Sequence, residues 1–283
     1  MINSLGMVVI EVPFEFENGH VVQLKTLLDT GSSECWLDAS VITAKGASQT
    51  TIRPTRILDA TGRWTKRQMP VVKGQWILPT GPTRSLQINT SDMKHDFLPG
   101  VVPFDALLGM DALSSGKLGI DFERHEVVFD DDDVYPVELP FTWKDGTIYV
   151  SLTVKNSDGS PEPDEWGKWL VDTGQSDAIV LPESYGPKFQ GQVYWSAGVI
   201  STLGARTHCK LFPRGEVWLG GAWRGPFDMR VGGTSVEPAI GTGLFNRCKI
   251  QIDFEHRIFR IKRYAGGPNS PQAHGRLKPP QGP

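Results

Sequence analysis

Leu-Leu-Asp-Thr-Gly-Ser-Ser, at positions 27–33, is an apolar run that ends in Asp-Thr-Gly. A related stretch, Leu-Val-Asp-Thr-Gly-Gln-Ser, recurs at positions 170–176 of this 283-residue chain. In each stretch the apolar run indicates a buried strand, and the Asp-Thr-Gly indicates a turn that carries one carboxylate into the interior. One such triplet is weak evidence, because turns are rich in these residues. Two copies in the same apolar setting are much stronger evidence.

A second pair of segments indicates that the chain is an internal duplication. Residues 107–129 and 239–261 align without a gap, and two apolar residues precede a glycine in each, Gly109 and Gly241. These glycines lie 132 positions apart, and Lys and Ile-Asp-Phe-Glu recur in register after them. The two Asp-Thr-Gly triplets lie 143 positions apart, so the loops of the two copies differ in length. Each half therefore contributes one Asp-Thr-Gly.

The paired motifs resemble those of the aspartic peptidases of the pepsin and retropepsin group, and the resemblance covers about residues 7–262. It implies an all-β fold of two homologous barrel lobes, related by a pseudo-twofold axis, with a cleft between them. It also implies that Asp29 and Asp172 are the catalytic residues. Pepsin-like flaps carry a tyrosine, but no tyrosine precedes residue 135. This absence and the short lobes favour a fused, single-chain retropepsin-like form.

The residues that follow each aspartate are expected to support the pair. Gly31 and Gly174 let the backbone approach closely, so that N–H groups can donate to the carboxylates. The resemblance implies that Thr30 and Thr173 hydrogen-bond across the pseudo-twofold axis and join the two loops.

The third residue after each aspartate is expected to tune the acidity of the pair. In the first half it is Ser32, whose hydroxyl can donate to the carboxylate and favour its ionisation. In the second half it is Gln175, where pepsin-like enzymes carry Thr or Ser and retropepsins carry Ala; this side chain either points away or reaches into the cleft. Gly109 and Gly241 are expected to pack beneath the two aspartate loops.

Each half also contains the pattern of a strand, a turn and a strand before its aspartate, at residues 7–28 and 147–171. Later hairpins, at residues 57–78 and 199–219, are the candidates for flaps over the cleft. The residues expected at the flap tips, and so against substrate, are Asp59, Ala60, Thr61, Gly62, Thr202, Leu203 and Gly204.

The expected organisation is an N-terminal lobe over residues 1–134, a C-terminal lobe over residues 135–264 and a tail over residues 265–283. The tail is rich in Gly and Pro and is expected to be disordered. The acidic run at 130–133 is interpreted as a linker between the lobes, with a solvated acidic loop as the alternative. A short helix is expected at residues 111–115.

Composition excludes several classes of function. No apolar run is long enough to span a bilayer, and a net charge of −3 with a pI of about 6.1 offers no basic face for nucleic acid. Three cysteines give no disulfide framework, and neither they nor the six histidines show the spacing of a metal site. No metal or cofactor is expected. No signal peptide or pro-segment is visible, so a cytoplasmic location is expected, although a trimmed secreted form would look the same.

Two carboxyls that share one proton can both activate a water and protonate a carbonyl oxygen, which is what peptide hydrolysis needs. We therefore expect an aspartic endopeptidase whose partner is a peptide or protein substrate with hydrophobic residues around the scissile bond. Because one chain holds both halves, we expect a monomer. The alternative is a non-catalytic member of the fold that binds a peptide or protein in the same cleft.

Overall fold

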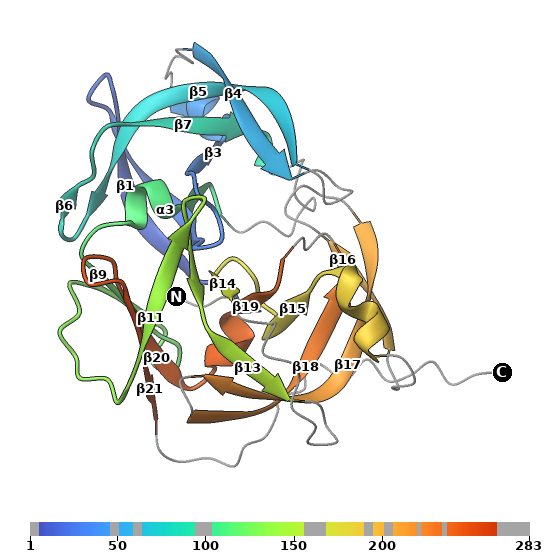
Figure 1. The fold of residues 1–283 in the computed structure, drawn as a ribbon. Helices are drawn as coiled ribbons and strands as arrows, with labels where there is room; N and C mark the ends of the chain where they lie inside the picture. Colours follow the sequence, from blue (N-terminus) through green and yellow to red (C-terminus); the bar gives the residue numbers. More distant parts are fainter. Residues whose placement is uncertain are drawn as a thin grey trace.

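The computed structural model describes residues 6–45, 51–58, 64–93, 104–155, 168–189, 195–200, 206–219, 222–233 and 237–264. The described chain is built mainly of β-strands in two lobes (Figure 1), so the all-β prediction is confirmed. The helical segments are short: α1 (Ala39–Lys45), α3 (Met110–Leu113), η2 (Glu183–Phe189) and η3 (Thr242–Phe245). No helix among these residues is both long and apolar enough to cross a membrane.

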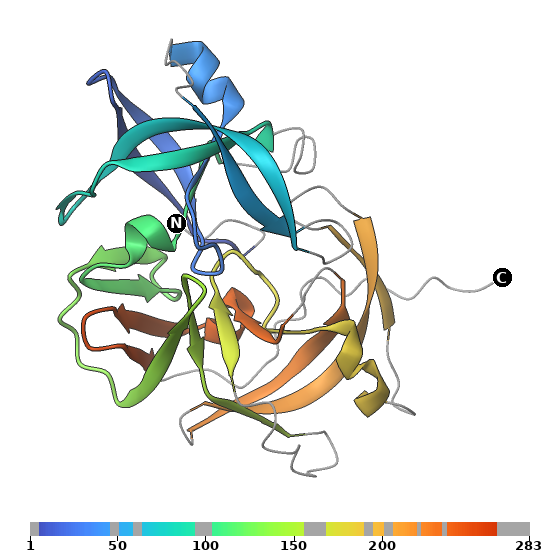
Figure 2. The ribbon, with the colours of Figure 1, turned by 45° about the horizontal axis from the view of Figure 1, so that its top comes forward.

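The first lobe is a β-barrel. Its strands follow the order β1-β2-β8-β3-β7-β5, and β1 pairs with β5 to close the barrel, with Phe14 opposite Trp76. Figure 2 shows this barrel above the second lobe. The strands of the first sheet are β1 (Val9–Phe16), β2 (Val21–Leu28), β3 (Trp36–Asp38), β4 (Thr51–Leu58), β5 (Trp64–Leu78), β6 (Gly81–Pro82), β7 (Leu86–Ser91) and β8 (Ala106–Leu108).

Strand β2 shows how the sequence directs the chain into the interior. Val22 and Leu24 are buried, whereas the residues that alternate with them are exposed, as expected for a strand with one solvated face. Leu27 and Leu28 are both fully buried, because here the strand runs beside β1 and β8. The strand therefore delivers the next residue, Asp29, to the centre of the molecule.

The second sheet contains thirteen strands in the order β10-β9-β20-β21-β11-β12-β14-β19-β15-β18-β17-β13 with β16 beside β17. Their bounds are β9 (Lys117–Asp121), β10 (Glu126–Phe129), β11 (Val137–Lys144), β12 (Thr147–Val150), β13 (Leu152–Lys155), β14 (Trp169–Asp172), β15 (Ile179–Leu181), β16 (Trp195–Ile200), β17 (Arg206–Leu219), β18 (Ala222–Gly232), β19 (Ala239–Gly241), β20 (Cys248–Asp253) and β21 (Ile258–Arg263).

The two halves of the chain share this second sheet. Strands β9 and β10 belong to the first half of the sequence but pair with β20 from the second half. In that pairing Gly119 lies opposite Gln251, its own counterpart in the repeat, so the pseudo-twofold axis passes between β9 and β20. The first sheet contains β1 to β8 and the second contains β9 to β21, so the chain passes from one sheet to the other before β9. The predicted lobe boundary at residue 134 follows the sequence repeat instead, and it stays a prediction.

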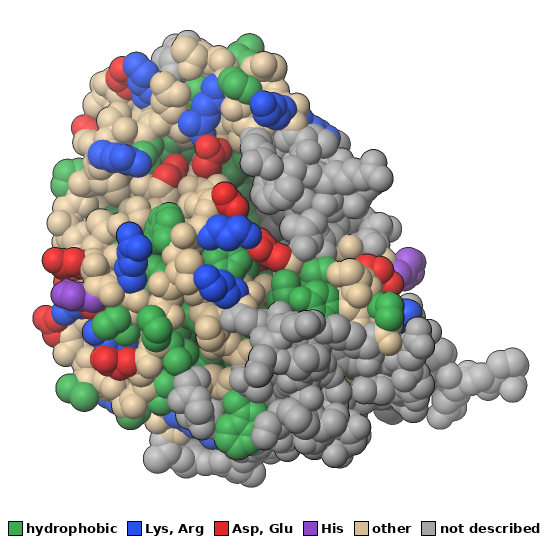
Figure 3. Space-filling view, in the orientation of Figure 1, with side chains coloured by type: hydrophobic (Ala, Val, Ile, Leu, Met, Phe, Trp, Pro, Cys, Tyr) green, Lys and Arg blue, Asp and Glu red, His purple; other side chains and the backbone are tan. Residues whose placement is uncertain are grey.

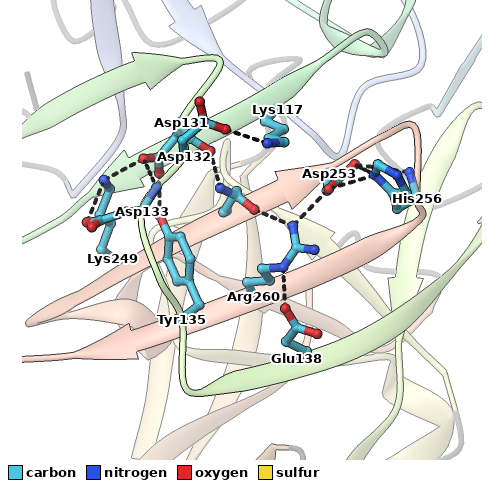
Figure 4. Close-up of polar contacts among 11 residues, drawn as sticks. Lys117, Asp131, Asp132, Asp133, Tyr135, Glu138, Lys249, Asp253, His256 and Arg260 are labelled. Carbon is cyan, nitrogen blue, oxygen red and sulfur yellow. Dashed lines mark hydrogen bonds and ion pairs between the residues drawn. The ribbon is translucent and has the colours of Figure 1, made fainter.

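The acidic run at 130–133 is fixed against the shared sheet (Figure 4). Asp131 is buried, and its carboxylate accepts hydrogen bonds from Lys249 Nζ at 2.9 Å and from the Tyr135 hydroxyl. Gln251 donates to its backbone carbonyl. The run connects β10 to β11 within the second sheet, so its interpretation as a linker between the lobes stays a prediction. The alternative of a wholly solvated loop is wrong at Asp131, because a buried carboxylate needs partners such as these.

One hydrophobic core runs through both lobes and the shared sheet. It includes Phe14 and Trp76 of the barrel, Ile120 of β9 and Phe259 of β21, all of which are fully buried. The predicted tail at 265–283 lies outside the described residues.

Candidate active site

The two aspartates reach the interior on equivalent strands. Asp29 follows β2, and its N–H donates to the carbonyl of Leu108 at 3.1 Å, while Asp172 ends β14 and lies opposite Gly241 of β19. In both lobes the strand before the aspartate runs parallel to the short strand before the glycine of the repeat. The two loops lie against one another, joined by hydrogen bonds between Thr30 and the loop of Thr173.

The threonines connect the two loops. Thr30 Oγ1 donates to the carbonyl of Val171 at 2.7 Å and accepts the N–H of Thr173 at 3.1 Å. The reciprocal bonds run from Thr173 Oγ1 to the carbonyl of Leu28 at 2.7 Å and from the N–H of Thr30 to Thr173 Oγ1 at 3.0 Å. Both threonines are fully buried, so these four bonds are shielded from water and hold the loops at a fixed separation.

The glycines show how closely the carboxyls approach one another. A Cβ on Gly31 would lie 2.5 Å from Cγ of Asp172, and a Cβ on Gly174 would lie 2.7 Å from Cγ of Asp29. Each carboxyl therefore packs on the glycine of the opposite loop. A side chain at that glycine position would displace the carboxyl. Each glycine N–H also donates to Oδ1 of the aspartate two residues before it, at 2.9 Å in both loops.

Gly109 and Gly241 lie against the aspartate loops. A Cβ on Gly109 would lie 2.4 Å from the carbonyl oxygen of Glu34, and one on Gly241 would lie 2.2 Å from that of Asp177. The residue after each glycine donates its N–H to the third residue after the aspartate, Met110 to the carbonyl of Ser32 at 2.9 Å and Thr242 to that of Gln175 at 2.8 Å. These close contacts need glycine and support both loops from one side.

The electrostatics of the pair are asymmetric. Asp29 is buried, whereas Asp172 retains some exposure. Burial raises the pKa of Asp29 well above its ordinary value, and the adjacent Asp172 carboxyl raises it further. Burial also raises the pKa of Asp172, but hydrogen bonds from Asp29 and the Gly174 N–H and the positive charge of Arg230 counteract this rise. The two carboxyls interact directly, so they share protons as a pair.

The expected role of Ser32 is wrong in this structure. Its hydroxyl donates to the carbonyl of Glu34 at 2.8 Å, and a hydroxyl has one proton to donate, so none remains for the carboxylate of Asp29. The backbone of Gln175 receives the N–H of Thr242, and its Cγ lies near Gly241. The donors that stabilise the ionised carboxylates are therefore mainly backbone N–H groups.

Each aspartate loop is covered by a segment from the other half of the chain. At the turn between β11 and β12, a Cβ on Gly146 would lie 2.7 Å from Cβ of Ser33. Near the N-terminus, Gly6 lies against Ser176, and its carbonyl accepts the hydroxyl of Thr242 at 2.7 Å. The two lobes thus exchange contacts at both loops, although the sequence reasoning did not predict these segments.

The predicted flap hairpins correspond to β4–β5 and β16–β17, which are antiparallel pairs. Leu58 lies opposite Trp64, and Ile200 opposite Arg206. The residues predicted for the flap tips lie outside the described residues: Asp59, Ala60, Thr61, Gly62, Thr202, Leu203 and Gly204.

Two ion pairs near the loops were missed by the sequence reasoning. Glu34 and Asp177, each five residues after an aspartate, pair with Arg53 Nη2 at 3.1 Å and with Arg230 Nη1 at 2.6 Å. The sequence does show that the two acids of these ion pairs occupy the same position in the repeat.

Cys35 forms hydrogen bonds through its buried thiol. Its buried Sγ donates to Oδ1 of Asp111 at 2.8 Å and accepts the N–H of Gly109 at 3.2 Å. Burial and the Asp111 charge raise the pKa of this thiol well above its ordinary value, so it stays protonated and serves as a donor. The pair joins the first aspartate loop to α3.

The exposed face in Figure 3 carries acidic and basic side chains interspersed over its described part.

No protein-family model matches the chain, and no curated protein matches its sequence. Among solved structures, the aspartic proteinase from Irpex lacteus is similar over 93% of this chain and 96% of its own length, with a TM-score of 0.57 and 12% sequence identity. At this identity the similarity establishes the fold alone: the chain has the two-lobe, pepsin-like fold of that aspartic proteinase.

Proposed function

We propose that this chain is an aspartic-type endopeptidase in which Asp29 and Asp172 activate one water between the lobes. The observation that carries the proposal is the contact of the two carboxyls, each packed on the glycine of the opposite loop. Holding two acids this close costs stability, since burial and mutual repulsion oppose their ionisation. Such strongly shifted pairs are typical of sites that move protons.

The chemistry follows from one proton shared by two carboxyls. The ionised carboxylate takes a proton from water while the water oxygen bonds to the carbonyl carbon of the peptide, and the protonated carboxyl gives its proton to the carbonyl oxygen. In the collapse of this intermediate, the carboxyl that took the water proton gives it to the nitrogen as the C–N bond breaks, and the other carboxylate takes a proton from a hydroxyl as the carbonyl re-forms. The threonine bonds fix the distance between the two groups, which this concerted transfer requires.

The finer features of the proposal rest on the sequence. A single-chain, retropepsin-like form is supported by the absence of tyrosine before residue 135. A substrate with hydrophobic residues around the scissile bond agrees with the apolar surroundings of both loops. Since both aspartates come from one chain, the site needs no second copy, and the proposed state is a monomer.

Hydrolysis of a quenched fluorescent peptide library between about pH 3 and pH 7 tests the proposal. The wild type, Asp29→Asn and Asp172→Asn are compared with and without a statyl-type inhibitor. Cleavage that the inhibitor blocks and that either substitution abolishes is the expected result. Since the Ser32 hydroxyl donates to the carbonyl of Glu34 and not to Asp29, activity should extend toward neutral pH.

A non-catalytic peptide-binding protein is the second candidate, favoured by the Ser32 hydroxyl bond to Glu34 rather than to Asp29. Folded protein that cleaves no peptide at any pH, but retains a peptide from the library, would replace the first proposal with this one.

A further inference from the structure

Two glycines, Gly6 and Gly146, occupy equivalent positions in the two halves of the chain. Each comes three residues before a strand residue that pairs with the residue two positions ahead of an aspartate, Val9 in the first half and Tyr149 in the second. Their φ angles are 79° and 81°, in the left-handed region that favours glycine. The duplication therefore repeats the same backbone turn ahead of β1 and of β12.

Both glycines lie against the aspartate loop of the opposite half, but the two contacts differ. A Cβ on Gly146 would lie 2.7 Å from Cβ of Ser33, so this contact is tightly packed. A Cβ on Gly6 would lie 3.6 Å from Cβ of Ser176, which is an ordinary van der Waals distance. The second contact instead includes a hydrogen bond from the hydroxyl of Thr242 to the carbonyl of Gly6 at 2.7 Å. Packing holds Gly146 in place, whereas Gly6 depends on a hydroxyl.

This hydroxyl has no counterpart in the first half, where Met110 occupies the position equivalent to Thr242. Both residues donate a backbone N–H to an aspartate loop, and that of Thr242 goes to the carbonyl of Gln175 at 2.8 Å. Gln175 in turn donates its N–H to the carbonyl of Asp172 at 3.3 Å. The buried hydroxyl of Thr242 lies 3.1 Å from the carbonyl of Gln175 and 2.7 Å from that of Gly6. One proton thus joins the chain at Gly6 to the loop of Asp172.

The N-terminal segment, residues 6–8, also bonds to β2, the strand that delivers the first aspartate. The N–H of Leu28 donates to the carbonyl of Val8 at 2.9 Å, and Val8 is buried. A path of hydrogen bonds and short chain segments therefore runs from Leu28, through the N-terminal segment and Thr242, to Asp172. The N-terminal segment bridges the two aspartate loops at a second place, apart from the threonine bonds beside the aspartates.

We propose that Thr242 is a positioning residue that holds the loop of Asp172 in its working orientation by binding it to the N-terminal segment. The inference rests on the proposed function and adds a residue that its site requires. The threonine bonds attach the two loops at one point, which fixes their separation but lets them tilt about that point. A second attachment prevents the tilt. Since proton transfer needs both carboxyls in place, loss of this attachment lowers the rate and leaves substrate affinity unchanged.

Kinetics of the full chain, with a peptide that the wild type cleaves, compare two substitutions of Thr242. Thr242→Val keeps the shape and removes the hydroxyl, whereas Thr242→Ser keeps the hydroxyl. A displacement of about 1 Å at a reacting group costs roughly 100-fold, so a smaller tilt should lower kcat of Thr242→Val by about tenfold at unchanged KM. Thr242→Ser should retain the kcat of the wild type.

The matched control for these variants is Thr90→Val in the first barrel. Thr90 is also buried, and its hydroxyl also donates to a backbone carbonyl, that of Pro70 at 3.1 Å. Thr90→Val should therefore lose stability as Thr242→Val does, because each leaves a buried carbonyl without this donor. Its kcat should stay that of the wild type.

The attachment can also be disturbed from the side of the N-terminal segment. Gly6→Ala places a Cβ on a backbone with a φ of 79°, so the chain must shift and disturb the bond to Thr242. Gly19→Ala carries the same strain, at a φ of 80°, in the turn between β1 and β2, where a Cβ would meet nothing within 4 Å in the described part of the chain. Gly6→Ala should lower kcat, and Gly19→Ala should not. Should Thr242→Val fail to fold, this pair of variants decides.

Carbon-13 NMR of the full chain, labelled at the carboxyl carbons of aspartate, tests the inference without any substrate. The resonances of the pair are assigned with Asp29→Asn and Asp172→Asn. Two close carboxyls titrate in two steps, and the gap between the steps shrinks as the carboxyls move apart. The gap should be narrower in Thr242→Val than in the wild type, Thr242→Ser and Thr90→Val.

An unchanged gap together with an unchanged kcat in Thr242→Val would overturn the inference. Equal effects in Thr242→Val and Thr90→Val, or in Thr242→Val and Thr242→Ser, would also overturn it, because the hydroxyl would then have no special place in the site. A narrowed gap in Thr242→Val, in a protein whose wild type cleaves no peptide, would support the positioning role and contradict the proposed function alone.

Discussion

At the scale of single residues, the carboxyl of Asp29 destabilises the folded protein at neutral pH. Its pKa is raised in the folded state, so as pH rises the unfolded chain ionises first and gains stability relative to the fold. The cost is absent below the ordinary carboxyl pKa and grows as pH rises toward the folded value. Asp29→Asn lacks this cost and should raise the melting temperature at pH 7 by about 2–4 °C, which corresponds to roughly 1 kcal/mol in a chain of this size.

Thermal unfolding at pH 7 and at pH 3 checks this prediction. At pH 3 the wild type and Asp29→Asn should melt at nearly the same temperature, because the carboxyl is protonated in both folded and unfolded states. An equal gain at both pH values would mean that ionisation is not its cause.

Gly31 leaves room for the carboxyl of Asp172 because it has no side chain. The Cβ of Gly31→Ala would meet Cγ of Asp172 at 2.5 Å, so the carboxyl must move. A displacement of about 1 Å at a reacting group can lower a rate by roughly 100-fold, and we expect a loss of at least that size in kcat. The matched control is Gly186→Ala, whose nearest neighbour would lie 3.9 Å away and whose kcat should match that of the wild type. An active Gly31→Ala enzyme would contradict the described geometry.

At the scale of elements, the threonine bonds join two loops that are far apart in sequence. Thr30→Val keeps the shape but leaves the Val171 carbonyl and the Thr173 N–H buried without this partner. Unmet buried groups cost about 1–3 kcal/mol each, so the free energy of unfolding should fall by roughly 2 kcal/mol or more. Urea unfolding measures the change, and Thr30→Ser, which keeps the hydroxyl, should lose far less. Equal losses in both variants would show that the hydroxyl bonds contribute no more to stability than the packing of the methyl group does.

The acidic run at 130–133 contacts a matched pair of lysines. Lys249 and Lys117 are repeat counterparts, but Lys249 is 9% exposed and holds the buried Asp131, whereas Lys117 meets Asp132, which is 84% exposed (Figure 4). Lys249→Met should cost about 3–5 kcal/mol, because it leaves a buried carboxylate without its cation. Lys117→Met should change the urea midpoint little. Similar midpoints for the two variants would show that the Asp131 contact adds nothing to stability.

The sequence predicted those parts of the site that the repeat and the local motif determine. The buried apolar strands and the Asp-Thr-Gly turns follow from Leu27, Leu28 and their counterparts, and the duplication then brings the loops together. It could not predict where the Ser32 hydroxyl points, because that depends on a competing carbonyl of Glu34 in the same turn. The repeat marks Asp177 as the counterpart of Glu34, but it does not identify the partner Arg230, which lies 53 positions away.

At the scale of the whole molecule, the all-β class and the two lobes were predictable because the duplication repeats the same order of strands. The shared sheet was not, since strand alternation identifies a strand but not its neighbour. The pairing of β9 with β20 joins residues more than a hundred positions apart, and it is visible only in the fold. The Asp145-Gly146 turn between β11 and β12 carried a recognisable hairpin signal that the sequence reasoning did not use.

The shared sheet should make the two lobes unfold together. Strands β9 and β10 complete the sheet of the second half, and one hydrophobic core includes side chains from both lobes. Opening one lobe would therefore expose apolar surface of the other and break the four threonine bonds. We expect a single calorimetric transition whose measured enthalpy equals the van't Hoff enthalpy. Two resolved transitions, or a calorimetric enthalpy well above the van't Hoff value, would show that the lobes are independent units and that the shared sheet couples them only weakly.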